Sequence, residues 1–271
     1  AFGQSTLLDS LSTQLAEANS PEKKAEIHYE IGLYFLDSMQ RYRAIDNFLL
    51  SYKMYEDLRD TMNMVANCRI VSTNYWFLRD FDEMLKYRLK ALKLLEVSGN
   101  QIEFGEATNA VAFVYLELDL LKESKEYLDK AIRISQDIDD PRLSMHVQTT
   151  MGHYHRVKEE YALASEWQGK AMASCRLLED NKELIEVLIS AATAQTYLNE
   201  WSASLAYLEE ALSLNAIDGT AEYEGFLIGE IGWMEYRMEK PGYGIEKIKQ
   251  SLDVGTKINN SPLIQRATRK L

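Results

Sequence analysis

A short polar side chain recurs at every fortieth position of this 271-residue chain. The members of this column are Ser20, Asp60, Asn100, Asp140, Asp180, Thr220 and Asn260. Such residues cap helices, because their side-chain oxygen accepts a hydrogen bond from a backbone N–H in the first turn. Two columns of small residues keep the same register: Ser51, Ala91, Ala131, Ala171, Ala211 and Ser251, and Gly32, Ser72, Ala112, Gly152, Ala192 and Gly232. Three columns in one phase predict a stack of similar supersecondary units.

Residues 140–180 indicate how one unit is built. Asp140 is a typical helix N-cap, and Pro141 suits the first helical position, where a missing N–H leaves no bond unmade. An amphipathic stripe then follows at spacings of three and four residues: Leu143, Val147, Met151, Tyr154 and Val157. The polar residues 158–160 predict a turn, and a second helix is expected from Tyr161 to about Leu178. Each unit is therefore predicted to be a helix, a tight turn and a second helix.

The small residues of each unit predict where its helices cross. Gly152 on the first helix, and Ala164 and Ala171 on the second, leave room for two backbones to approach each other. A larger side chain at such a crossing typically costs about 1–3 kcal/mol.

The pattern of small and aromatic residues resembles the tetratricopeptide repeat. Three copies carry it: Met151-Gly152-His153-Tyr154 with Tyr161, Ala164, Trp167 and Ala171; Val111-Ala112 with Tyr115, Tyr127 and Ala131; and Ala191-Ala192 with Trp201, Ser204, Tyr207 and Ala211. HEAT and armadillo arrays, with periods of about 40–47 residues, are the alternative. Small residues in phase on both helices favour the tetratricopeptide type. The resemblance implies an all-α, right-handed superhelical solenoid of about six helix-turn-helix repeats with flanking helices.

The forty-residue register also predicts the domain boundaries. We expect a capping helix at 5–19, the repeat array at 20–260 and the start of a truncated seventh repeat at 261–271. The six repeats are expected near 25–58, 65–98, 105–138, 145–178, 185–218 and 225–258. Residues 1–4 are interpreted either as the remnant of a secretory signal or as residues left by cloning. The signal-like start favours the periplasm over the cytoplasm.

Composition and motifs narrow the classes of function. With 30 Lys and Arg against 42 Asp and Glu, the chain carries a formal charge of −12, which disfavours nucleic acid as a partner. No stretch approaches the roughly 18 apolar residues of a membrane span. The chain contains no glycine-rich phosphate loop, no nucleophile elbow and no Cys–His pair in phase, so we predict neither an enzyme nor a cofactor. His146 and His153 share a helix face, but without a third ligand such as Glu106 or Glu186 we predict no metal site.

The resemblance places a binding groove on the first helix of each pair, which lines the concave surface in this family. The candidate ligand-binding residues are Tyr29, Arg69, Trp76, Asn109, Phe113, His146, His153, Arg156, Tyr197, Trp233, Tyr236 and Arg237. Trp, Tyr and Arg dominate binding hot spots. The alternative is that Trp76 and Trp233 pack against the next repeat. A clamp for acidic C-terminal tails is not predicted, because Thr73 and Phe113 replace two of its polar residues.

Three functions remain open at this stage, and each has a protein or peptide as its partner. The first is a protein- or peptide-interaction module, because the chain resembles the N-terminal arrays of Bacteroidetes-like sensor kinases and regulators. The second is a stand-alone assembly scaffold, which would form homodimers through terminal repeats near Ile248, Leu252 and Ile258. The third is a regulatory receptor of the peptide-pheromone type.

The groove assignment predicts the behaviour of two variants. Combining Arg69→Ala with Asn109→Ala is expected to weaken binding of the native partner with little change in the thermal midpoint. Ala171→Leu is expected to lower the midpoint and leave the groove chemistry untouched, because it overpacks a helix crossing. Affinity and thermal unfolding measured on both variants check this. Unchanged affinity in the double variant would mean that the binding face lies elsewhere.

Overall fold

The computed structural model describes residues 2–271, with side chains described from residue 7 onward except at 218 and 222. Within that range the backbone forms fourteen helices and no strand, which confirms the all-α fold. The helices are α1 (Phe2–Glu17), α2 (Pro21–Asp37), α3 (Arg41–Leu58), α4 (Thr61–Phe77), α5 (Phe81–Glu96), α6 (Gln101–Glu117), α7 (Leu121–Ile138), α8 (Pro141–Val157), α9 (Tyr161–Leu177), α10 (Asn181–Tyr197), α11 (Trp201–Asp218), α12 (Ala221–Arg237), α13 (Pro241–Lys257) and α14 (Ser261–Lys270). Ala1, part of the segment interpreted as a signal remnant, lies outside the described residues.

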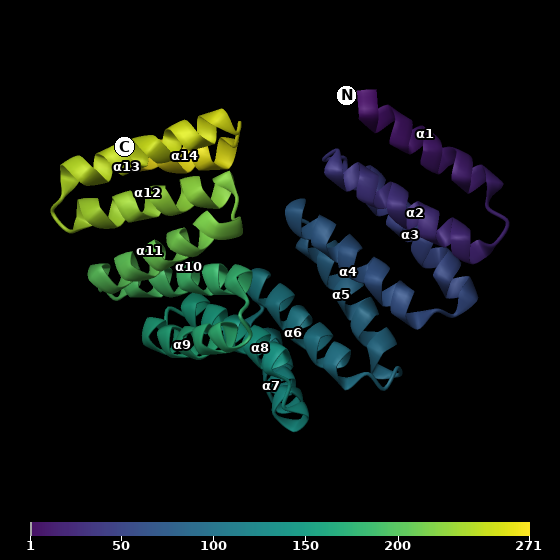
Figure 1. Ribbon diagram of the computed structural model, residues 1–271. Coiled ribbons are helices and arrows are strands. Elements are labelled where there is room, and N and C mark those ends of the chain that lie inside the picture. The colour runs from purple at the N-terminus through teal and green to yellow at the C-terminus, as the bar shows by residue number, and fades with distance from the viewer. Residues whose placement is uncertain (1) are drawn as a thin grey trace. The chain divides into compact units, whose positions relative to one another are not determined.

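The chain divides into two compact units, Ala1–Ile138 and Asp139–Leu271. Within each unit, consecutive helices pack as antiparallel pairs (Figure 1). The pairs are α2 with α3, α4 with α5 and α6 with α7 in the first unit, and α8 with α9, α10 with α11 and α12 with α13 in the second. The division falls at the end of the third predicted repeat, so each unit holds three whole helix pairs. No described helix is both long enough and apolar enough to cross a bilayer.

All seven residues of the polar column cap the helix that follows them, which confirms the prediction. In each case the side-chain oxygen accepts a hydrogen bond from the backbone N–H three residues later. The donors are the amides of Lys23, Asn63, Glu103, Leu143, Glu183, Tyr223 and Leu263. The shortest of these bonds, at Asp140, is 2.7 Å, and the longest, at Thr220, is 3.3 Å. Each cap typically contributes about 1 kcal/mol to helix stability.

The backbone has a second period of twenty residues. A left-handed residue, with φ between 54° and 75°, ends nearly every helical segment: Met39, Arg59, Arg79, Gly99, Asp119, Asp139, Glu159, Glu179, Asn199, Glu239 and Asn259. At nine of these eleven positions the amide that follows donates to the carbonyl five residues back, as from Gln40 N to Phe35 O at 2.8 Å. This bond is typical of the Schellman C-cap. Gly219 departs from the period with a φ of −86°, and the Asn215 side chain satisfies the backbone of Thr220 there.

The small columns lie at the closest approaches between helices, as predicted. All twelve residues of the two columns are buried. A Cβ atom placed on Gly32 would lie 2.5 Å from a ring carbon of Phe48, and one on Gly152 would lie 2.9 Å from Cγ of Gln168. At Gly232 the nearest atom would be the carbonyl oxygen of Gly244, at 2.7 Å. Only small residues therefore fit these crossings.

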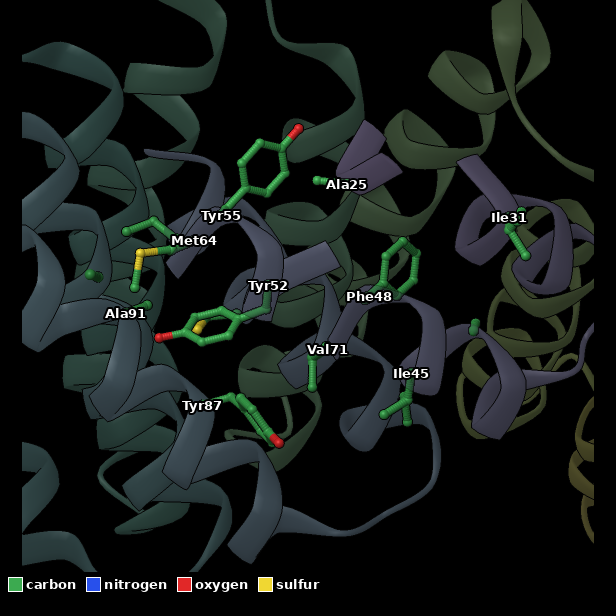
Figure 2. Close-up of a cluster of buried hydrophobic side chains, with 14 of the residues drawn as sticks. Ala25, Ile31, Ile45, Phe48, Tyr52, Tyr55, Met64, Val71, Tyr87 and Ala91 are labelled. Carbon is green, nitrogen blue, oxygen red and sulfur yellow. The ribbon is translucent and has the colours of Figure 1, made fainter. Parts of the chain in front are cut away.

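Each unit has its own hydrophobic core. In the first unit, side chains from six consecutive helices form one cluster, among them Ile31, Phe48, Val71 and Tyr87 (Figure 2). In the second unit, the cluster includes Leu188, Leu227, Ile231 and Met234, which are all 2% exposed or less. Within each unit, each helix pair packs against the next pair, so the stability of one repeat depends on its neighbours.

Two glycine-to-alanine variants in the second unit test the crossing geometry. Gly232→Ala is expected to destabilise the protein by about 1–3 kcal/mol, because its methyl group would meet backbone atoms of α13. Gly169→Ala, on α9, has no atom within 4 Å of the new Cβ, so the gain in helix propensity is expected to add about 0.5–1 kcal/mol. Urea unfolding measures both values. Shifts of the same sign would contradict the assignment of Gly232 to a helix crossing.

Candidate binding site

In the first unit, the predicted aromatic residues are engaged in packing. The ring of Tyr29 meets Phe48 edge-on at 5.1 Å between centroids. Trp76 is half-buried, and its ring lies 5.3 Å from Phe113 of the next repeat and 5.6 Å from Phe81. Trp76 therefore packs against the next repeat, which was the alternative to a role in the groove.

The predicted polar residues of the first unit are also partly buried. Arg69 on α4 forms an ion pair with Glu103 on α6. Asn109 is 7% exposed, and its Oδ1 is enclosed without a hydrogen-bond donor among the described residues. The double variant Arg69→Ala with Asn109→Ala thus also removes an interhelical ion pair, so we now expect a lower thermal midpoint besides any loss of affinity.

Three predicted residues of the second unit, His146, His153 and Arg156, lie half-buried on α8. Burial, and then the charge of Arg156, lower the pKa of His153 to about 4. His153 is therefore neutral at pH 7 and offers one nitrogen as donor and the other as acceptor. Within residues 2–271, no three His, Cys, Asp or Glu side chains gather closely enough to hold a metal ion.

Tyr197 and Trp233, two of the candidate residues predicted from the sequence, line a common pocket in the second unit. The pocket has a volume of about 630 Å³ and is lined by residues of α10, α12 and α14 and of the turn before α14. We call it the α14 pocket; its lining is Thr193, Thr196, Tyr197, Phe226, Glu230, Trp233, Met234, Asn260, Pro262, Leu263, Gln265, Arg266, Arg269 and Lys270. Its volume lies within the range of about 300–1,000 Å³ that is typical of ligand sites.

Aromatic rings form the apolar walls of the α14 pocket, and neighbours hold them in place. Tyr197 is 58% exposed and stacks on Tyr161 with 4.4 Å between ring centroids. Trp233 is half-buried and stacks on Tyr236 at 5.7 Å. The guanidinium of Arg266 lies 4.5 Å from the ring centre of Phe226. These flat surfaces are therefore positioned before any ligand arrives.

The charged residues of the α14 pocket give it a positive balance. Glu230 accepts a hydrogen bond from Arg266 Nε at 2.6 Å and lies 2.5 Å from Lys270 Nζ. Burial lowers the pKa of Lys270, and the charge of Glu230 opposes that shift. Arg269 also lines the pocket and has no ion-pair partner in the described part of the chain. Three cations and one carboxylate leave a net charge of +2 in a chain whose total is −12.

The last two predicted residues, Tyr236 and Arg237, are exposed and do not line the pocket. Arg237 places its guanidinium 4.6 Å from the ring centre of Trp201. The candidate residues predicted from the sequence did not include the cations of α14, which are Arg266, Arg269 and Lys270. The reason is that this helix was interpreted only as the start of a truncated repeat. Arg266 stands forty residues after Phe226, so extending the register by one more repeat finds it.

Comparison with known proteins supports the fold assignment. No protein-family model and no curated protein sequence matches the chain. Among solved structures, apo RapI matches 92% of this chain and 89% of its own with a TM-score of 0.70 at 15% identity. A Rap protein complexed with competence and sporulation factor matches 97% of this chain and 78% of its own (TM-score 0.68, 11% identity). A STAND protein with a tetratricopeptide repeat sensor, from Pyrococcus horikoshii, matches 93% of this chain and 43% of its own (TM-score 0.68, 17% identity). Such likeness defines the class of fold: the chain is a tetratricopeptide-like α-solenoid.

The lowered pKa of His153 predicts a pH dependence of stability. In the unfolded chain a histidine has a pKa of about 6.5, whereas the folded value is about 4. As the pH falls between these values, the unfolded state binds the proton first, so the free energy of unfolding falls by up to about 3 kcal/mol. His153→Gln is expected to reduce this loss, measured by urea unfolding at pH 7 and pH 4.5. An identical pH dependence in the variant and the wild type would contradict the assignment.

Proposed function

We propose that this chain is a protein-interaction module that binds a peptide segment in the α14 pocket. The observation that carries the proposal is an aromatic pocket with a net charge of +2 in an otherwise acidic chain. Neither hydrolytic nor redox machinery is needed for such a role, and we infer binding rather than catalysis.

The lining defines the kind of segment that fits. An apolar or aromatic side chain of the ligand stacks on Trp233 and Tyr197, which are of the residue types that dominate binding hot spots. An acidic side chain pairs with Arg269, because Glu230 already neutralises part of the charge of Arg266 and Lys270. The segment is therefore expected to combine carboxylates with at least one large apolar residue. Long-range attraction by the cations also speeds association at low salt.

For the biological role, we propose the sensory or scaffolding part of a larger bacterial signalling protein. The match to the STAND protein, whose repeats form a sensor within a chain more than twice as long as the matched part, supports this role. A regulatory receptor is the second candidate, because a Rap protein that holds competence and sporulation factor matches nearly the whole chain. A stand-alone scaffold that dimerises through its terminal repeats is the third, and sedimentation analysis would detect its self-association.

A peptide selection tests the proposed binding. A phage-displayed library of random dodecapeptides, panned on the wild-type chain, is expected to yield sequences enriched in Asp, Glu and aromatic residues. Trp233→Ala is expected to weaken binding of a selected peptide at least about tenfold, which corresponds to about 1.4 kcal/mol. Fluorescence anisotropy with labelled peptide measures the affinity.

Tyr243→Ala is the matched control for this experiment. Tyr243 is a 74% exposed aromatic residue on α13, and it does not line the pocket. Its variant is expected to bind the selected peptides as the wild type does. Selected peptides without acidic residues, or an equal loss of affinity in both variants, would contradict binding in the α14 pocket.

A further inference from the structure

Arg88 occupies a core position of the first unit. In the other repeats the equivalent position on the second helix is held by Phe48, Leu128, Gln168, Leu208 and Ile248, each 3% exposed or less. Arg88 is the only charged residue of this column. In the other repeats this position holds a buried, uncharged side chain, so the charge of Arg88 needs a physical explanation.

The equivalent side chains show where this position points. The ring of Phe48 lies against Tyr29 on the first helix of its own repeat. Gln168 Nε2 donates to Ser190 Oγ, at 2.6 Å, on the first helix of the next repeat. In the same register, Arg88 on α5 is directed between α4 and α6.

The Arg88 guanidinium has no compensating anion. It forms no ion pair and no hydrogen bond with the part of the chain that the structure describes, and its Nε is enclosed. Burial, and then the neighbouring charge of Arg69, lower the pKa of Arg88 to about 10, so it is still protonated at pH 7. Burying a charge without a partner is strongly unfavourable. The residue as a whole is half-buried, and Nε is the only nitrogen of its guanidinium that is enclosed without a partner among the described residues.

The charged residues around Arg88 do not neutralise its positive charge. Glu103 on α6 pairs with Arg69 on α4, and that pair is neutral. The region between α4 and α6 therefore holds one excess cation, and a carboxylate is the complement of that charge.

We propose that Arg88 binds a carboxylate of an acidic peptide between α4 and α6. A guanidinium pairs with a carboxylate through two parallel hydrogen bonds. The single charge of a carboxylate matches the single excess cation, whereas a phosphate dianion would leave a negative charge in a half-buried site. The proposal extends the peptide-binding function to the first unit, and it does not require the α14 pocket to bind.

Substitution of Arg88 by the residues of sister repeats tests the proposal. Arg88→Leu places there the residue found at 128 and 208, and Arg88→Gln the one found at 168. Without ligand, Arg88→Leu is expected to raise the thermal midpoint, because it removes an unpaired charge from the core. Arg133→Leu, at an exposed position of α7, makes the same charge change and is expected to leave the midpoint unchanged. A lower midpoint in Arg88→Leu than in the wild type would show that the arginine is a structural residue and overturn the proposal.

The ligand arm of the test compares two blocked tripeptides, acetyl-Gly-Glu-Gly-amide and acetyl-Gly-Gln-Gly-amide, at equal ionic strength. The Glu peptide is expected to raise the thermal midpoint of the wild type, Arg133→Leu and Trp233→Ala more than the Gln peptide does. Arg88→Leu and Arg88→Gln are expected to lose this difference, because a tripeptide without a large apolar residue does not occupy the α14 pocket. Equal effects of the two peptides on the wild type, or a larger effect of inorganic phosphate, would overturn the carboxylate assignment. Loss of the difference in Trp233→Ala instead would assign it to the α14 pocket and overturn the site at Arg88.

Discussion

The close approach of helix backbones at the small columns is the constraint on which the rest of the structure depends. At Gly232 there is no space for a methyl group, because the carbonyl oxygen of Gly244 would lie 2.7 Å from it. This crossing sets the distance between the two helices of a pair, so equivalent positions of successive first helices meet similar surroundings. The aromatic and charged residues of α10, α12 and α14 converge on one pocket for this reason. A solenoid of this kind positions the side chains of its pocket through the packing of the helices that carry them.

The two proposed binding regions concentrate positive charge in different ways. The chain carries a net charge of −12, yet each region concentrates positive charge. In the α14 pocket, Glu230 holds two cations in place and leaves Arg269 for a ligand. Between α4 and α6, Glu103 neutralises Arg69 and leaves Arg88 unpaired. In both regions an internal carboxylate orders part of a cationic cluster, and the remaining charge is available to an acidic partner.

The turns show why some features could be predicted and others could not. The N-caps were predictable, because a cap requires a side-chain oxygen such as that of Asp140. The left-handed residues that end the helices were not, because Met39, Arg79 and Glu159 share no side-chain property that would mark them. Their conformation is imposed by the hydrogen bonds of the helix end and by the packing of the next helix, neither of which depends on the residue type. The twenty-residue period is therefore visible only in the backbone.

The amino-acid sequence by itself determined the repeat, the starts of the first helices and the points of closest packing, because each depends on a local property: an oxygen that accepts a bond, or the absence of bulk. It also identified the helix faces that carry Tyr197 and Trp233. Only the tertiary structure decided which residues of those faces remain accessible. Trp76 packs on Phe113 and Arg69 pairs with Glu103, whereas Arg266 from the last helix completes the pocket. Each of these partners comes from a neighbouring repeat more than thirty residues away, and a periodic pattern specifies the face of a helix but not what that face meets.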